Sequence, residues 1–106
     1  MDSIRLGKAG ERVSPVCLGT MYFGSKTDLE TSRDLLDRYF EAGGRFLDTA
    51  NTYATWLDGV DEPSSEPLLG DWMADRGNRD KVFIATKVGF EYGDVPQALD
   101  PALIKQ

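Results

Sequence analysis

Histidine is absent from the 106-residue chain, and cysteine occurs once. Without an imidazole, these residues offer no His-based catalytic scheme, and one thiol leaves no ligand set for a zinc ion, so we expect no metal site. A single cysteine also cannot form an intrachain disulfide. Cys17 stands in the apolar run Val16-Cys17-Leu18, and because unpaired cysteine is usually buried, we expect a small buried thiol there.

Basic residues and long apolar runs are also scarce. The chain has 12 lysines and arginines against 18 acids, a formal net charge of −6, with the two signs mixed along the sequence. It therefore lacks the basic face that binds nucleic acid and the polybasic segment that binds an anionic membrane. No run approaches the ~18 apolar residues of a membrane span, and the first residues form no apolar signal segment. We expect a cytoplasmic protein that binds neither nucleic acid nor membrane.

Turn and helix signals divide the chain into short elements of one domain. Gly7 and Gly10 bracket a four-residue connection between residues 3–6 and 11–14, which is typical of a β-hairpin. Apolar runs and helix start signals then alternate. The expected strands are residues 16–20, 46–47 and 82–86, and the expected helices begin near Thr27, Ser65 and Pro101.

This order predicts an α/β fold with a parallel sheet. Strands separated by helices pair in parallel through right-handed crossovers, and continuous apolar strands fit a sheet that is covered on both faces. No glycine-rich dinucleotide fingerprint follows the first of these strands, which argues against an open Rossmann sheet. Polar residues at the ends of the next two strands favour a barrel.

The first two expected helices have boundary signals. Thr27-Asp28-Leu29-Glu30 has the spacing of a capping box, so we expect Thr27 as the N-cap. Ser65-Glu66 is expected to cap the second helix, which should stop near Gly77. The side chains expected to face the core are Leu29, Leu35, Leu36, Tyr39 and Phe40 in the first helix, and Leu68, Leu69, Trp72 and Met73 in the second.

A third helix signal stands near residue 106. Asp100-Pro101 places an N-cap before proline at the first helical position, and five residues follow it. Isolated helices shorter than roughly 12–15 residues are marginal in water. We therefore expect the natural chain to continue beyond this point.

Three polar residues follow two of the expected strands. Asp48 and Tyr53 come after strand 46–47, and Lys87 comes after strand 82–86. A phenol beside a Lys–Asp pair suits proton donation to a carbonyl oxygen, because the ammonium stabilises the phenolate and the carboxylate orients the ammonium. Taken singly, each residue has another interpretation: a turn acid, a loop aromatic or a solvated charge.

Four motifs, in the right order along most of the chain, resemble the aldo-keto reductase superfamily. They are Leu18-Gly19-Thr20-Met21 with Phe23-Gly24, Gly44-Arg45-Phe46-Leu47-Asp48-Thr49-Ala50 with Tyr53, Ser65-Glu66 with Leu69-Gly70, and Ile84-Ala85-Thr86-Lys87. Members are (β/α)8 TIM barrels with a hairpin across the barrel bottom, and they bind NADPH and reduce aldehydes and ketones to alcohols. The resemblance implies that residues 1–106 are the N-terminal part of such a domain, a hairpin and the first three β/α units.

The resemblance also implies roles for the three polar residues. Asp48, Tyr53 and Lys87 match the Asp, Tyr and Lys of the family's catalytic set. The fourth member, a histidine, belongs to the next strand, beyond Gln106. The expected function is therefore NADPH-dependent reduction of a small carbonyl compound by the full-length protein, with this chain inactive alone. The alternative is a non-catalytic regulatory protein on the same scaffold.

The cofactor implied is NADPH. Gly19, Thr20 and Met21 match the stretch beside the nicotinamide ribose, together with Asp48, although glycine at position 19 equally suits close packing. Two further aromatic residues, Phe23 and Trp56, fit either a substrate pocket or packing within the core and loops.

Overall fold

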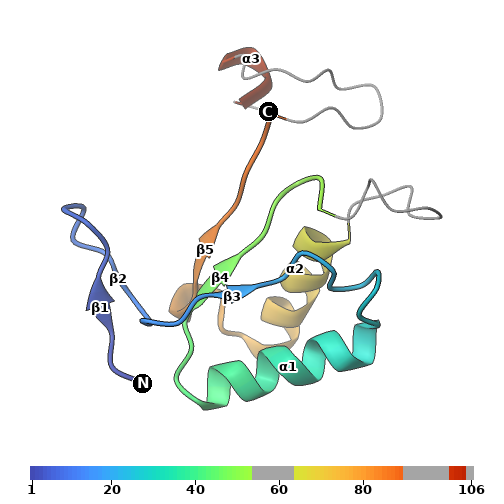
Figure 1. Cartoon of the computed structure of the whole chain (residues 1–106), viewed down its shortest axis with the longest axis horizontal. Helices are drawn as coiled ribbons and strands as arrows, with labels where there is room; N and C mark the ends of the chain where they lie inside the picture. Colours follow the sequence, from blue (N-terminus) through green and yellow to red (C-terminus); the bar gives the residue numbers. More distant parts are fainter. Residues whose placement is uncertain (54–63, 90–100, 105–106) are drawn as a thin grey trace.

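The computed structural model describes residues 1–53, 64–89 and 101–104. Its centre is a three-stranded parallel sheet in the order β3-β4-β5. The strands are β3 (Leu18–Gly19), β4 (Phe46–Asp48) and β5 (Phe83–Ala85). An antiparallel hairpin of β1 (Ile4–Arg5) and β2 (Arg12–Val13) precedes them and stands to one side of the sheet (Figure 1). The predicted hairpin and parallel strands are confirmed; β4 is one residue longer than expected and the other strands are shorter.

Two helices connect the parallel strands. Helix α1 (Leu29–Glu41) links β3 to β4, and helix α2 (Ser65–Arg76) lies between β4 and β5. Both helices lie on the same side of the sheet (Figure 1). A single 3-10 turn, η1 (Arg79–Lys81), leads from α2 into β5. The short helix α3 (Pro101–Ile104) begins at the proline that its start signal indicated.

The main core lies between one face of the sheet and the two helices. The register places Leu18, Leu47 and Ile84 side by side across the three strands. Leu47 is fully buried, and the other two pack against the same cluster. Fully burying one side chain of this size contributes roughly 1.5–3 kcal/mol. The helix residues of the cluster are Leu36, Leu68, Leu69, Trp72 and Met73, so the predicted inner face of α2 is confirmed.

The other face of the sheet carries the alternate residues of each strand, because successive side chains point to opposite sides. Phe46 and Phe83 are opposite each other in the register, and their rings meet edge to face with centroids 5.5 Å apart. Asp48 and Ala85 lie further along the same face, at the carboxyl ends of β4 and β5. The candidate site is therefore on the side away from α1 and α2.

The N-terminus of α1 differs from the prediction by one residue. Asp28 is the N-cap, and its carboxylate accepts a hydrogen bond of 2.7 Å from the Thr31 amide. Thr27 cannot take that role because its backbone is held in the preceding loop, where its amide donates to the Tyr22 carbonyl and its carbonyl accepts from Gly24. The Asp28 pKa is lowered chiefly by this backbone hydrogen bond.

Two leucines that were predicted to face the core from α1 are exposed. Leu29 is 57% exposed and Leu35 is 41% exposed, whereas Leu36 is fully buried. Consecutive helical residues are about 100° apart around the axis, so Leu35 and Leu36 cannot share one narrow stripe. Leu29 is the first residue of the helix, ahead of the buried stripe that begins at Ser32.

Cys17 is exposed, so the expectation of a buried thiol was wrong. The residue precedes β3, and alternation places it opposite Leu18, whose side chain packs into the core. Its apolar neighbours in the sequence indicated burial, but Val16 is itself 57% exposed. An apolar run in the sequence predicts that a buried strand forms, but it does not predict which face of that strand the helices cover.

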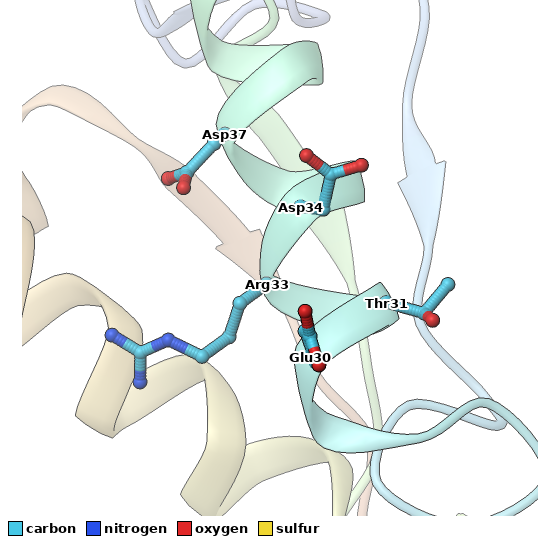
Figure 2. A pocket seen from close by; sticks show the side chains of 5 residues that line it. All are labelled: Glu30, Thr31, Arg33, Asp34 and Asp37. Atoms are coloured by element: carbon cyan, nitrogen blue, oxygen red, sulfur yellow. The ribbon is translucent and has the colours of Figure 1, made fainter.

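The two helices are also joined by polar contacts on their outer surface. A hollow of about 450 Å³ along α1 is lined by Glu30, Thr31, Arg33, Asp34 and Asp37. Figure 2 shows the side chains of Arg33 and Asp37 directed toward α2, where they meet Asp75 and Arg76 respectively. This hollow belongs to the helix layer and is separated from Asp48 by the sheet.

The predicted stop of α2 is confirmed. Gly77 follows the helix in the left-handed conformation, with φ of 62°, and its amide donates to the Met73 carbonyl. Trp56 lies outside the described residues. None of the helices in the described part of the chain has the length and apolar character needed to cross a bilayer.

Candidate active site

Asp48, Tyr53 and Lys87 come together at the carboxyl edge of the parallel sheet. Asp48 is the last residue of β4, and Lys87 lies two residues past the end of β5. Since β4 and β5 run parallel in register, their ends meet at the same edge. The backbone continues this pairing past the strands, because the Asn51 amide donates to the Lys87 carbonyl over 3.2 Å.

Besides the Tyr53 hydroxyl, the Lys87 ammonium is bound by three oxygen acceptors of β4 and the segment after it. It donates to both carboxylate oxygens of Asp48, over 3.0 Å and 3.2 Å, and to the carbonyl of Thr49 over 2.9 Å. The side chain of Lys87 remains 48% exposed and that of Asp48 36% exposed, so the pair is open to solvent and to a ligand.

The Tyr53 phenol completes the arrangement. Its hydroxyl donates to Asp48 Oδ2 over 3.2 Å and accepts a hydrogen bond from Lys87 Nζ. The ammonium also lies 4.4 Å from the centre of the phenol ring. One hydroxyl thus has a carboxylate as acceptor and an ammonium as donor.

The pKa of Lys87 is raised. Partial burial by itself lowers it, but the hydrogen bonds with Tyr53 and then Asp48, together with the charge of Asp48, outweigh that effect. Lys87 is therefore a fixed positive charge at neutral pH.

The residues expected beside a nicotinamide ribose lie next to Asp48 at the end of β3. Gly19 pairs with Asp48 in the register, and a side chain added to it would meet no described atom within 4 Å. Met21 is 38% exposed. Thr20 is fully buried, and its hydroxyl is bonded within the protein. The open space is therefore beside Gly19, which pairs with Asp48.

Cys17 shares this environment. The pKa of its thiol is raised, first by desolvation near the sheet and then by the charge of Asp48, with an opposing effect of Lys87. A raised pKa keeps the thiol protonated, and only the thiolate is a good nucleophile.

Phe23 belongs to the core rather than to a substrate pocket. It is 6% exposed and is part of the cluster with Leu68 and Trp72. Its carbonyl also accepts a hydrogen bond from Ser64, the N-cap residue of α2. Of its two possible interpretations, packing is confirmed.

Ser65 differs from its predicted role as a helix cap. Ser64 is the N-cap of α2, without a capping bond from its side chain, and Ser65 is the first helical residue. The Ser65 hydroxyl is fully buried and contacts the hydroxyls of Thr20 and Thr49. Sequence reasoning missed this cluster. The available signal was a small hydroxyl residue directly after each of two strands and a third at a helix start.

Comparison with known proteins agrees with this geometry. Residues 15–105 match the model of the Aldo/keto reductase family. A norsolorinic acid reductase of Emericella nidulans is 48% identical over 91 residues, which cover 79% of this chain and 22% of that protein. An aryl-alcohol dehydrogenase [NADP(+)] of Phanerodontia chrysosporium is 42% identical over 91 residues, which cover 78% of this chain and 22% of that protein. The chain thus spans about a fifth of the length of these relatives.

The solved structure of an aldo-keto reductase from Bacillus halodurans, in its holo form, superimposes with a TM-score of 0.70 at 30% identity. The match covers 92% of this chain and 29% of that structure. The predicted fold class is confirmed: the described strands and helices are part of a TIM-barrel fold, and by themselves they form an open sheet. The chain belongs to the aldo/keto reductase family.

Proposed function

We propose that residues 1–106 are the N-terminal part of an NADPH-dependent reductase domain that converts a small aldehyde or ketone to an alcohol. The observation that carries the proposal is the contact of the Tyr53 hydroxyl with both Lys87 and Asp48. Reduction of a carbonyl builds negative charge on its oxygen, and a positioned acid must supply a proton there. The phenol is the proton donor in this proposal.

The other two residues support the phenol. Lys87 donates a charged hydrogen bond to the phenol oxygen, which stabilises the phenolate formed after proton donation. Asp48 binds the ammonium through both of its carboxylate oxygens, over 3.0 Å and 3.2 Å, in charge-assisted hydrogen bonds. The Thr49 carbonyl accepts a further hydrogen bond from the ammonium and so restricts its position. The phenol is thereby kept at one place on an open edge of the sheet.

The residues around this edge fit a nicotinamide cofactor. NADPH, when bound, supplies the hydride, while the protein supplies orientation and electrostatics. Gly19 leaves open space beside its partner Asp48, and Met21, two residues further along the chain, is exposed. We assign the cofactor-binding role to Gly19, Met21 and Asp48. Thr20 contributes indirectly, because its hydroxyl and its amide both hold the Asp48 carbonyl.

The relatives support the cofactor and the substrate class. One carries NADP(+) in its name as an aryl-alcohol dehydrogenase, and another is named a norsolorinic acid reductase. From the name of the aryl-alcohol dehydrogenase we propose NADPH rather than NADH as the cofactor. From the same name we propose that the substrate carries its carbonyl group on an aromatic ring system.

The test requires a complete barrel. We would join residues 1–106 to the remainder of the Emericella nidulans norsolorinic acid reductase at the aligned position, with the intact relative as the positive control. Loss of NADPH absorbance with an activated aromatic aldehyde would be followed. We expect turnover on the order of 1–10 per second that requires Tyr53. A folded fusion that binds NADPH but turns over no aldehyde would contradict the proposal and favour a non-catalytic regulatory role.

A further inference from the structure

The first turn of α2 lies directly behind the candidate site. Ser65 Oγ is 2.7 Å from Thr20 Oγ1 and 2.7 Å from Thr49 Oγ1. All three residues are at most 1% exposed. Thr20 follows β3, Thr49 follows β4, and Ser65 begins α2. Three buried hydroxyls thus join the ends of two strands to one helix start.

The directions of these hydrogen bonds follow from counting protons. A hydroxyl has one proton to donate, and Thr20 donates its proton to the Asp48 carbonyl over 2.9 Å. Ser65 must therefore donate to Thr20. Since the Ser65 proton is then used, Thr49 must donate to Ser65. The chain of bonds runs from Thr49 through Ser65 and Thr20 to the Asp48 carbonyl.

This chain of bonds holds the peptide group between Asp48 and Thr49. The Asp48 carbonyl accepts from the hydroxyl of Thr20 and also from its amide, over 3.0 Å. At the other end of the same peptide group, the Thr49 amide donates to the Ala85 carbonyl over 2.8 Å. The residue before this peptide group, Asp48, carries the carboxylate that binds Lys87. The residue after it, Thr49, carries the carbonyl that also binds Lys87.

The next residue of α2 reaches the third strand. Thr86, which directly precedes Lys87, donates its hydroxyl proton to the Glu66 carboxylate. Ser65 and Glu66 together therefore contact the residues that follow β3, β4 and β5. The same helix turn touches the peptide behind Asp48 and the residue before Lys87.

We propose that Ser65 is a positioning residue for the Asp48–Lys87 pair, and that Glu66 supports it from the β5 side. Ser65 alone both accepts from Thr49 and donates to Thr20, so its removal leaves a buried donor and a buried acceptor without their partner. An unpaired buried group draws in water or shifts the backbone. Such a shift moves the carboxylate relative to the ammonium. The inference rests on the proposed carbonyl reduction, which it extends.

The test compares two buried serines in the fusion described above. Ser65→Ala removes the hydroxyl behind the site. Ser32→Ala is the matched control, because Ser32 is also fully buried and its hydroxyl bonds the Asp28 carbonyl over 2.7 Å, in the helix layer. Ser65→Thr keeps a donor and an acceptor and serves as the conservative variant. All three are compared with Tyr53→Phe.

We expect Ser65→Ala to lower kcat by roughly 10- to 100-fold, the range for small misplacement of a catalytic group, and to leave KM nearly unchanged. The pH profile of kcat should shift as well. Ser65→Thr should restore most of the wild-type kcat and most of the wild-type pH profile. Ser32→Ala should keep the wild-type kcat and pH profile despite a similar loss of thermal stability. A Ser65→Ala enzyme with normal kcat and pH profile, beside an inactive Tyr53→Phe, would overturn the positioning role while leaving the reaction intact.

A second measurement does not depend on turnover. The pKa of Lys87 can be followed by NMR with labelled lysine in the fusion. Loss of the Asp48 contact in Ser65→Ala should bring this pKa down toward its ordinary value, whereas Ser32→Ala should leave it in place. If the Lys87 pKa is the same in both variants, Ser65 does not position the pair, even where the activity of Ser65→Ala is lost through poor folding.

Discussion

Two groupings of an acid, a cation and an aromatic side chain can be compared within the described residues, and they serve different purposes. At the sheet edge, Asp48 binds Lys87 and the Tyr53 hydroxyl. In the helix layer, Asp37 binds Arg76 through two bonds of 2.8 Å and 2.9 Å, and it accepts from the Trp72 indole over 2.8 Å. A carboxylate is the centre of both groupings.

The difference lies in which protons can move. The Trp72 indole donates only, and the guanidinium of Arg76 stays charged at all ordinary pH values, so the helix-layer group has no transferable proton. A phenol both donates and accepts, and an ammonium beside it stabilises the phenolate. Trp72 is also 1% exposed, whereas Asp48 and Lys87 are open to solvent. Similar geometry therefore serves packing in one place and suits proton transfer in the other.

The largest effect is expected when the 106-residue chain is expressed alone. The sheet face that carries Phe46 and Phe83 lies opposite the face that packs against the two helices, and an open parallel sheet has unpaired edges that associate. We expect no aldehyde reduction and a broad, weakly cooperative thermal transition with self-association, measured by calorimetry and light scattering. A sharp melt of a clean monomer, or turnover of roughly 1 per second or more, would contradict this.

The next largest effect concerns proton transfer at the sheet edge. In the fusion, Tyr53→Phe keeps the ring and removes the proton donor, so kcat should fall by roughly 10²- to 10⁴-fold while NADPH still binds. Lys87→Met should cause a similar loss, because Asp48 and the phenol lose their cation. The double variant should be little worse than the poorer single variant, since both changes disable one unit. If the fold-loss of kcat in the double variant equals the product of the two single losses, the residues act separately.

The corresponding change in the helix layer should affect stability alone. Trp72→Phe removes the indole donor to Asp37 and some buried volume, so we expect a loss of about 1–3 kcal/mol in the free energy of unfolding. The measurement is denaturant unfolding of the fusion, together with kcat at a temperature where the variant is folded. A kcat lowered as far as in Tyr53→Phe would remove the distinction between the two groupings.

The smallest effect is a pH dependence of stability. Arg76 lowers the pKa of Asp37 to about 2, chiefly through its hydrogen bonds, from an ordinary value of 3.8. Because the folded-state pKa is the lower one, the stabilisation is present above pH 3.8 and is lost as the pH falls through about 2. Both side chains are partly exposed, so we expect about 1 kcal/mol after screening by solvent.

Asp37→Asn provides the comparison for this pH effect. Its free energy of unfolding, measured by urea titration between neutral pH and pH 2, should lie below that of the wild type at neutral pH and approach it at low pH. A difference that stays constant over this range would show that the charge of Asp37 is not its source.

Much of the fold was predictable because its signals are local. Gly7 and Gly10 indicated the hairpin, Gly77 indicated the end of α2, and apolar runs indicated the three parallel strands. The three residues of the sheet edge were also predictable, since parallel strands bring their carboxyl ends to one place. Each of these features depends on turn chemistry, on periodicity or on chain order, which a sequence displays directly.

Tertiary structure decided the features that depend on distant partners. Cys17 is exposed because the helices cover the other face of the sheet, and Phe23 is buried because α2 packs over it. Ser65 looked like a helix cap, yet its hydroxyl partners lie 45 and 16 residues away, at Thr20 and Thr49. Short-range patterns in the sequence specify which elements form, whereas the burial and the hydrogen-bond partner of a side chain are set by the segments that folding brings beside it.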